Sequence, residues 1–234
     1  MGHYPPAWRQ KALALPHCLD ARMVRTVSPR PKTRQIRIAY VGNLFEGART
    51  EGRLFDAFAR VVDTVPQAAD AELVFVGETP PSVAKRARDL GLAERVSFSG
   101  TVSFQEAQAW MASADMLLVI DRPAQKNIFF PSKLVEYLAW NKPVLGLTPT
   151  EGVTATILRR CGWPTAEPDD TAGIARALTA LLVDPGAFWG QQATRKRRAV
   201  LAAYDTATVS RRFAVLLERV RSKQTSRPAA AGRR

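Results

Sequence analysis

The hydrophobic positions of the chain form short continuous runs that alternate with longer stretches of helical spacing. The short runs are rich in β-branched residues and end at glycine or at polar residues, as buried strands do. They predict strands over residues 36–42, 72–77, 96–98, 115–120 and 143–147. Because strands that are apolar at nearly every position must be covered on both faces, these runs predict a parallel sheet between two layers of helices.

The stretches between the runs carry apolar residues at every third or fourth position, which predicts helices. Two helices have recognisable ends: proline and glycine bracket residues 81–91, and Ser103 with Glu106 forms a capping box. The predicted helices span 52–65, 81–91, 103–114, 132–140, 151–161 and 170–183. With right-handed crossovers, this order predicts an α/β fold with a doubly wound, Rossmann-like parallel sheet over residues 35–185.

The two ends of the chain depart from this alternation. Residues 1–34 carry prolines and scattered charges, and only Lys11–Leu15 suggests a helix there. C-terminal helices are expected over residues 186–222 with a cap at Asp205, and residues 223–234 are expected to be a disordered basic tail. After Asp205, the apolar residues fall on one helical stripe: Val209, Phe213, Leu216, Leu217 and Val220.

Composition narrows the class of protein. The chain has 234 residues, of which 46% are hydrophobic and 24% charged, as in ordinary globular proteins. The strongly apolar run Met116–Ile120 lies between two aspartates and is far shorter than the roughly 20 residues that a membrane helix needs. Cys18 and Cys161 have no spacing typical of a zinc or redox site, which favours a cytoplasmic location.

The net charge of +13 is concentrated at the two ends. Residues 1–34 carry seven basic and one acidic side chain, residues 35–194 carry 15 and 18, and residues 195–234 carry 12 and two. A nucleic-acid-binding core is more often basic throughout, so nucleic acid is not an expected partner. The basic ends favour contact with an anionic membrane surface, at its inner face, or with a partner domain. A third possibility is that the C-terminal stripe packs on the chain's own sheet.

Two glycines mark places where a ligand can approach the sheet. In a doubly wound sheet, ligands bind beyond the carboxyl ends of the strands, and two predicted strands end in Val-Gly at Gly42 and Gly77. Glycine lets the backbone turn tightly and lets a phosphate come close, although it is also an ordinary way to end a strand. The residues after Gly42 do not follow the G-x-G-x-x-G pattern, which disfavours a nicotinamide or flavin enzyme.

The sharpest chemical signal is the start of the predicted helix 132–140. Pro131 and Ser132 indicate a helix N-terminus, whose amide N–H groups and positive dipole favour an anion. Lys133 is unfavourable to that dipole unless a bound diphosphate offsets its charge. Glu136, one turn further, can accept hydrogen bonds from sugar hydroxyls at the same mouth. The alternative interpretation is a capped amphipathic helix with Lys133 and Glu136 in solvent.

Several short blocks stand in a characteristic order: V-G-N-L, F-V-G, R-V-S-F-S-G-T-V, S-A-D and P-S-K-L-V-E-Y-L-A-W-N-K-P-V-L. Over about residues 13–220, this order resembles the donor-binding half of GT-B glycosyltransferases, closest to the retaining family 4 type. The resemblance implies hexosyl transfer from a UDP- or GDP-linked sugar with retention at the anomeric carbon. It further implies a role in glycan, polysaccharide or glycolipid synthesis.

The resemblance also assigns roles to residues of this chain. It implies contacts to the donor diphosphate from Gly42, Arg49, Ser132, Lys133 and Leu134, to the ribose from Glu136, and to the base from Thr101 and Val102. Lys133, Arg49 and helix N-termini would stabilise the departing diphosphate, so neither an obligatory metal nor a separate cofactor is expected. Asp169-Asp170 is interpreted as a helix start rather than a metal motif.

The chain departs from the family pattern at two points. A glutamate that the family commonly has eight positions before Glu136 is Ile128 here, as in a subgroup that reads Pro-Ser-Lys-Leu. The segment Leu15–Asp20 resembles the connector that follows the family's N-terminal acceptor domain. We therefore interpret residues 1–34 as a connector remnant with His17 as a hinge residue. The expected partner is the missing acceptor domain or a separate subunit, which would hold part of the catalytic site.

Other functions stay open on the sequence alone. The chain could be a non-catalytic module that binds a nucleotide sugar and needs a separate acceptor subunit. A sugar-nucleotide epimerase has the same architecture, but residues 131–145 fit a transferase better. If the chain is half of an enzyme, it is expected to be weakly active or inactive by itself.

Overall fold

Six parallel strands form one sheet in the computed structural model, which describes residues 5–9, 12–20, 24, 27–31, 34, 36–44, 50–189 and 191–225. The strand order is β3-β2-β1-β4-β5-β6, and every neighbouring pair is parallel. The direction of winding reverses between β1 and β4, the position where doubly wound sheets bind ligands. The strands are β1 (Ile36–Val41), β2 (Ala71–Val76), β3 (Val96–Phe98), β4 (Met116–Ile120), β5 (Val144–Leu147) and β6 (Thr165–Ala166).

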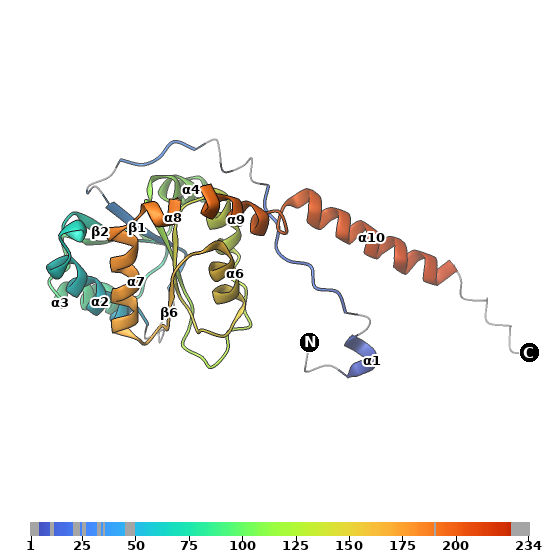
Figure 1. Ribbon diagram of the computed structural model, residues 1–234, viewed down its shortest axis with the longest axis horizontal. Coiled ribbons are helices and arrows are strands. Elements are labelled where there is room, and N and C mark those ends of the chain that lie inside the picture. Colours follow the sequence, from blue (N-terminus) through green and yellow to red (C-terminus); the bar gives the residue numbers. More distant parts are fainter. Residues whose placement is uncertain are drawn as a thin grey trace, which may run out of the picture.

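Helices cover both faces of the sheet because successive strand residues point to opposite sides. Ile38 and Tyr40 pack in one apolar cluster with α2 (Thr50–Thr64), α3 (Pro81–Asp89) and α7 (Thr171–Val183). Ala39 packs in the other cluster, whose helices are α4 (Phe104–Ser113), α5 (Lys133–Trp140), α6 (Val153–Cys161) and α9 (Gln191–Leu201). Figure 1 shows these helices around the central sheet.

The sequence-based elements agree closely with the structure. Each of the five predicted strands and six predicted helices is confirmed to within two residues at either end. The capping box of Ser103 and Glu106 is present, and the Asp170 side chain accepts a hydrogen bond from the Gly173 N–H. The short β6 and the 3₁₀ turn η2 (Pro66–Ala68) were not predicted.

Two predictions for the chain ends are wrong. No helix is present over residues 12–15, where the backbone is irregular, and a short α1 lies instead at Pro6–Arg9. At the other end, α10 (Thr206–Thr225) continues through residues 223–225, which were expected to be disordered. Residues 226–234 of the expected tail lie outside the described residues.

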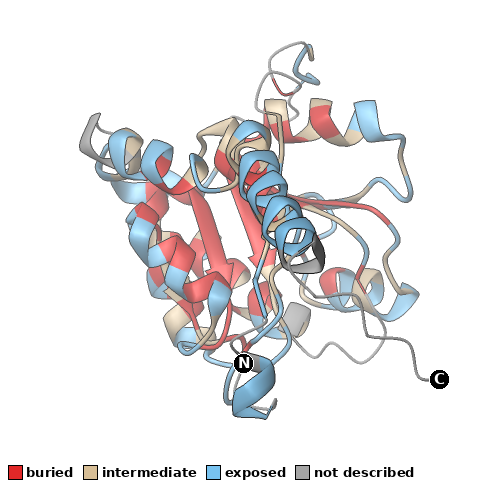
Figure 2. Cartoon of the chain, turned by 90° about the vertical axis from the view of Figure 1, so that its right-hand side faces the viewer, coloured by how far each residue is buried: buried red, intermediate tan, exposed pale blue. Residues whose placement is uncertain are grey.

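The last helices leave the sheet. After α8 (Gly186–Trp189) and α9, α10 begins at Asp205, whose carboxylate accepts hydrogen bonds from the N–H groups of Ala207 and Thr208 at 3.0 and 3.3 Å. Figure 1 shows α10 running away from the sheet, and Figure 2 shows that most of it is exposed. Of the predicted stripe, Val209 is buried, whereas Phe213, Leu217 and Val220 are about half exposed. The stripe therefore does not pack on the chain's own sheet.

Candidate functional site

The loops after β1 and β2 touch at the carboxyl edge of the sheet, and glycine makes this approach possible. Gly42 and Gly77 have φ angles of +145° and +129°, a region that residues with a side chain rarely adopt. A Cβ at Gly77 would lie 2.6 Å from the Gly42 carbonyl oxygen. Gly77 is thus required for backbone contact between the two loops, and Gly42 for close approach of the Lys133 side chain, which is more than a strand end needs.

Helix α5 presents its N-terminus to this edge. Its buried side chains Leu134, Tyr137 and Leu138 pack against the sheet. The Tyr137 hydroxyl accepts a hydrogen bond from the Val41 N–H at 2.9 Å, which fixes α5 to the end of β1. Burial raises the pKa of Tyr137, so this hydroxyl stays protonated. The sequence predicted Tyr137 only as a packing residue; its bond to β1 has no signal in the local pattern.

Lys133 lies at the centre of a group of residues that we call the Lys133 cluster. Its other members are Tyr40, Gly42, Asp121 and Glu136. The Lys133 Nζ is 3.9 Å from the centre of the Tyr40 ring, and a Cβ at Gly42 would collide with it. Burial lowers the pKa of Lys133 to about 8, and the nearby carboxylates of Asp121 and Glu136 oppose this shift. Lys133 is therefore not the solvated side chain of the alternative interpretation.

The first turn of α5 offers backbone donors beside this lysine. Within the described part of the chain, the amide N–H groups of Ser132 and Lys133 donate to no protein acceptor. The Leu134 N–H differs, because it donates to the Pro131 carbonyl at 3.0 Å. Two of the three first-turn amides thus have no protein partner among the described residues and are available to an anion, and the third is already paired.

A cavity of about 510 Å³ opens next to Lys133. Its wall includes Asp121, the first residue after β4, whose carboxylate accepts a hydrogen bond from the Thr148 hydroxyl at 2.7 Å. Ile128 and Phe129 line the same cavity and are 66% and 78% exposed. Asp121 was missed by the sequence analysis, although its place directly after a buried strand at the switch point is a usable signal.

Glu136 lies one turn further along α5 and is held from α4. Its Oε2 accepts a hydrogen bond from the Gln108 Nε2 at 2.7 Å. Burial raises the pKa of Glu136, whereas this hydrogen bond and the Lys133 ammonium lower it. Gln108 was missed because a single polar residue in a helical pattern does not reveal what it faces.

Two more of the predicted residues lie in the neighbouring loop after β3, and a third lies outside the described residues. Thr101 and Val102 follow β3, where the Gly100 carbonyl accepts a hydrogen bond from the Gly77 N–H at 2.9 Å. Within the described residues, neither of them is hydrogen bonded to Gly42, Lys133 or Glu136. Arg49 lies outside the described residues. The roles assigned to these three residues stay predictions.

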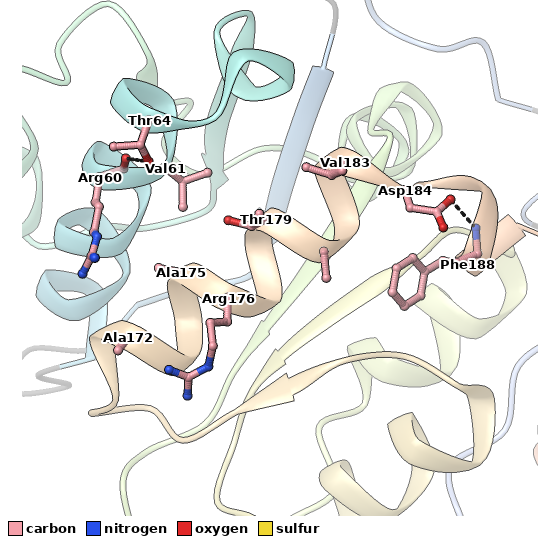
Figure 3. A pocket seen from close by; sticks show the side chains of 12 residues that line it. Arg60, Val61, Thr64, Ala172, Ala175, Arg176, Thr179, Val183, Asp184 and Phe188 are labelled. Carbon is pink, nitrogen blue, oxygen red and sulfur yellow. Dashed lines mark hydrogen bonds between the residues drawn. The ribbon is translucent and has the colours of Figure 1, made fainter.

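A second cavity, of about 660 Å³, lies away from the switch point between α2, α7 and α8. Figure 3 shows its two walls, with Arg60 and Thr64 on α2 and Arg176 on α7. The remaining wall is mostly alanine, valine and threonine, and none of the predicted site residues lies there. Its chemistry therefore does not compete with that of the Lys133 cluster.

The N-terminal segment lies against the start of α10. The His17 ring stacks on Phe130 with centroids 5.8 Å apart, and Phe130 stacks on Tyr204 at 5.3 Å. The Leu19 N–H donates to the Tyr204 carbonyl at 3.1 Å. These contacts join the predicted connector to the turn before α10, and the hinge role of His17 stays a prediction.

The described residues also bear on metal binding and on membrane crossing. Across the described ranges, no group of three or more His, Cys, Asp or Glu side chains could hold a metal ion. None of the helices in that part of the chain is long and apolar enough to span a bilayer.

The fold and the Lys133 cluster define a Rossmann-like domain with an anion-suited helix N-terminus at its switch point. The family model described as "Glycosyl transferases group 1" matches residues 35–184, and the chain belongs to this family. No curated protein sequence matches the chain.

Solved structures share the fold at low sequence identity. HepE from Anabaena, in a crystal structure with UDP, has a TM-score of 0.68 and 16% identity; the match covers 87% of this chain and 56% of HepE. Sucrose-phosphate synthase from Thermosynechococcus elongatus has a TM-score of 0.67 and 18% identity, covering 89% of this chain and 52% of the synthase. The chain thus spans little more than half of these proteins.

One similar structure is an isolated domain, and the match covers nearly all of it. The C-terminal domain of LpcC, a group 1 glycosyltransferase from Francisella tularensis, has a TM-score of 0.60 and 18% identity. The match covers 80% of this chain and 99% of that domain. Together these likenesses show that the chain has the GT-B-like fold.

Proposed function

We propose that this chain is the donor-binding half of a retaining glycosyltransferase of family 4 type, which binds a UDP- or GDP-linked sugar. The observation that carries the proposal is Lys133, whose ammonium is drawn into the domain between Tyr40 and Gly42. Within the described residues, this ammonium forms no hydrogen bond and no close ion pair, and the carboxylates of Asp121 and Glu136 offset the effect of its burial only in part. Removing an ammonium from water is costly unless an anion accompanies it, and a diphosphate supplies that anion.

The same arrangement suits the chemistry of sugar transfer. When the bond between the sugar and the diphosphate breaks, negative charge develops on the departing phosphate oxygen. Lys133 and the N–H groups of Ser132 and Lys133 are donors already in place, so they can stabilise this charge without rearrangement and without a divalent ion. Glu136, with one carboxylate oxygen held by Gln108, is positioned to accept from the ribose hydroxyls.

Nucleotide binding tests this proposal directly. We expect UDP or GDP to raise the free energy of unfolding of the chain, and with it the melting temperature. At a nucleotide concentration of 100 times the dissociation constant, the gain in free energy is about 2.7 kcal/mol. Lys133→Ala should weaken this binding by about tenfold or more, because hydrogen bonds to charged groups are worth about 1.5–3 kcal/mol. Lys85→Ala, which removes an exposed lysine paired with Asp89, is the matched control and should leave the affinity unchanged. Absence of binding by UDP, GDP and ADP would refute the proposal.

We further propose that an acceptor-binding domain, in the same protein or in a separate subunit, covers the exposed face of α10. The chain spans 56% of HepE, so a relative of that length has room for a second domain of similar size. Phe213, Leu217 and Val220 are about half exposed, and Arg212 on the same helix donates to the Ala14 carbonyl at 3.3 Å. An apolar helix face that is left uncovered in a folded domain marks an interaction surface.

An anionic membrane is the competing occupant of this face, since an apolar stripe beside arginines can also lie at a lipid interface. Sedimentation with phosphatidylglycerol vesicles at low salt distinguishes the two. We expect the chain to stay in the supernatant, and binding that Phe213→Ser with Leu217→Ser abolishes would assign α10 to the membrane instead. The proposed compartment is the cytoplasm, which suits the free thiols of Cys18 and Cys161.

The alternative is a module that binds the donor without taking part in catalysis. If the acceptor surface belongs to a separate domain or subunit, as proposed, both functions predict no sugar transfer by the purified chain alone, because positioning of the acceptor can account for about 7–11 kcal/mol of a barrier. They differ when a separately encoded acceptor half is added. Transfer that then depends on Lys133 identifies the chain as half of the enzyme, whereas transfer independent of Lys133 identifies it as a module.

A further inference from the structure

Gln108 is a buried polar residue in the layer of helices that carries α5. It is 2% exposed, and both ends of its side-chain amide are hydrogen bonded. The Nε2 donates to Glu136 Oε2 at 2.7 Å, and the Oε1 accepts from the Trp140 indole Nε1 at 3.1 Å. Glu136 and Trp140 are four residues apart on α5, so a single amide from α4 joins two neighbouring turns of one helix face.

The chemistry of the three groups fixes the direction of this amide. An indole nitrogen can only donate a hydrogen bond, so it must face the carbonyl oxygen of Gln108. The NH₂ group of Gln108 then faces Glu136, and an ionised carboxylate is its natural acceptor. Trp140 thus sets the orientation of Gln108, and Gln108 sets the orientation of Glu136.

This arrangement occupies one carboxylate oxygen of Glu136 and leaves the other available. Within the described residues, Oε1 of Glu136 accepts no hydrogen bond. The Glu136 side chain as a whole is only half-buried, so it is not closed off from solvent. Burial acts to protonate Glu136, and the hydrogen bond from Gln108 opposes that effect.

We infer that Gln108 is a positioning residue that makes the site selective for ribonucleotides over deoxyribonucleotides. It holds Glu136 with one oxygen turned toward the ribose hydroxyls of the donor. The inference rests on the proposed function, since it places the donor's ribose at Glu136. An oriented carboxylate is a known way for α/β sheets to bind a ribose 2′-hydroxyl, and its value depends on the groups that hold it in place. Without Gln108, Glu136 can turn away or take up a proton, and the contact is lost.

The test compares the affinities of ribose and 2′-deoxyribose nucleotides, by titration calorimetry with UDP, GDP and their 2′-deoxy forms. The parent chain should prefer the ribonucleotide by about tenfold, the value of one hydrogen bond to a charged group. In Gln108→Leu, the affinity for the ribonucleotide should fall to that for the deoxynucleotide, while the latter stays unchanged. Trp140→Phe should lose part of the preference, because the Gln108 amide is then free to turn over.

A merely structural role is excluded by a matched control. Met111 lies one turn from Gln108 on α4 and is buried in the same layer, but it takes no part in the hydrogen bonds that join Gln108 to Glu136 and Trp140. The control variant is Met111→Ala. It should destabilise the fold and leave the ratio of the two affinities as in the parent. If Gln108→Leu does not fold, the ratio in Trp140→Phe decides.

The possible failures are distinguishable. A parent chain that binds no nucleotide overturns the proposed function and this inference with it. A parent that binds nucleotides in a Lys133-dependent way but does not distinguish ribose from deoxyribose overturns the inference alone. An unchanged ratio in both Gln108→Leu and Trp140→Phe also overturns the inference, because Gln108 then serves only to join α4 to α5.

Discussion

Helices α5 and α10 have similar sequence patterns, but the apolar stripe of α5 is buried and that of α10 is largely exposed. Each has an apolar stripe with basic character beside it, from Lys133 in α5 and from several arginines in α10, and each begins after a polar residue. In α5, Leu134 and Leu138 are at most 1% exposed, whereas in α10, Phe213 and Leu217 are 48% and 53% exposed. The difference arises from the surroundings, since α5 packs on the sheet and contacts α4 and α9, whereas α10 extends past the edge of the sheet (Figure 1).

The comparison shows that an apolar stripe predicts that a helix face will be covered, but does not predict which surface covers it. For α5 the partner is the sheet of the same domain, and that packing fixes the position of Lys133 and Glu136. For α10, only Val209, in its first turn, is buried in the described structure. The three predictions that follow test this difference, from the largest expected effect to the smallest.

The same substitution should have very different costs in the two helices. Leu138→Ala removes a fully buried side chain and should lower the free energy of unfolding by about 2–5 kcal/mol. Leu217→Ala removes a half-exposed one and should change that free energy by about 0.5 kcal/mol or less. Urea unfolding of both variants measures the two costs. Equal costs would show that α10 packs against the domain in solution.

The cations of the two helices should also differ in how pH affects binding. Lys133 in α5 has a pKa lowered to about 8, and only its charged form attracts a diphosphate. The affinity for UDP or GDP should therefore vary little between about pH 7 and 8, where the terminal phosphate is already ionised, and fall by up to about tenfold per pH unit above pH 8. Calorimetric titrations from pH 6.5 to 9.5 measure this profile. Arg219→Met, a loss of charge on exposed α10, should leave the profile unchanged, and a profile that is flat in the parent would contradict the site.

Removing a positive charge should raise the free energy of unfolding when the charge lies on α5 and leave it unchanged when the charge lies on α10. The folded chain holds the Lys133 ammonium in a poorly solvated place, so between about pH 8 and its ordinary pKa the unfolded chain binds more protons. The contribution of Lys133 to stability therefore rises with pH over that interval. Lys133→Met should raise the free energy of unfolding at pH 7 by about 1 kcal/mol, as substitutions at functional sites often do. Arg219→Met should have no measurable effect, and a loss of stability in Lys133→Met would mean that the ammonium is favourably paired.

The sequence predicts the body of the fold well and the details of the site less well. Runs such as Met116–Ile120 predict buried strands because five consecutive apolar residues between aspartates are too few for a buried helix. The two-residue β6 has no such run, so it was not predicted. The suggested helix at Lys11–Leu15 fails because helical spacing over a few residues is too weak a signal without packing to support it.

The candidate site divides in the same way. Gly42 and Lys133 could be singled out because their residue types are unusual at those positions, and the structure brings them together. Asp121, Gln108 and the hydroxyl of Tyr137 matter through contacts between distant segments, which a linear pattern does not contain. The exposure of the α10 stripe belongs to the same class, because it depends on what lies opposite the helix.

The bridge between Leu19 and Asp205 gives the domain a further property. Because the chain enters and leaves the sheet unit at one point, with the Leu19 N–H bonded to the Tyr204 carbonyl at 3.1 Å, the unit has adjacent ends. A domain with adjacent ends can be inserted into a surface loop of another protein without stretching either, and it tolerates circular permutation for the same reason. Residues 19–205 are therefore a portable unit, which could be grafted between two halves of a reporter so that ligand binding is read as a change in the reporter's signal.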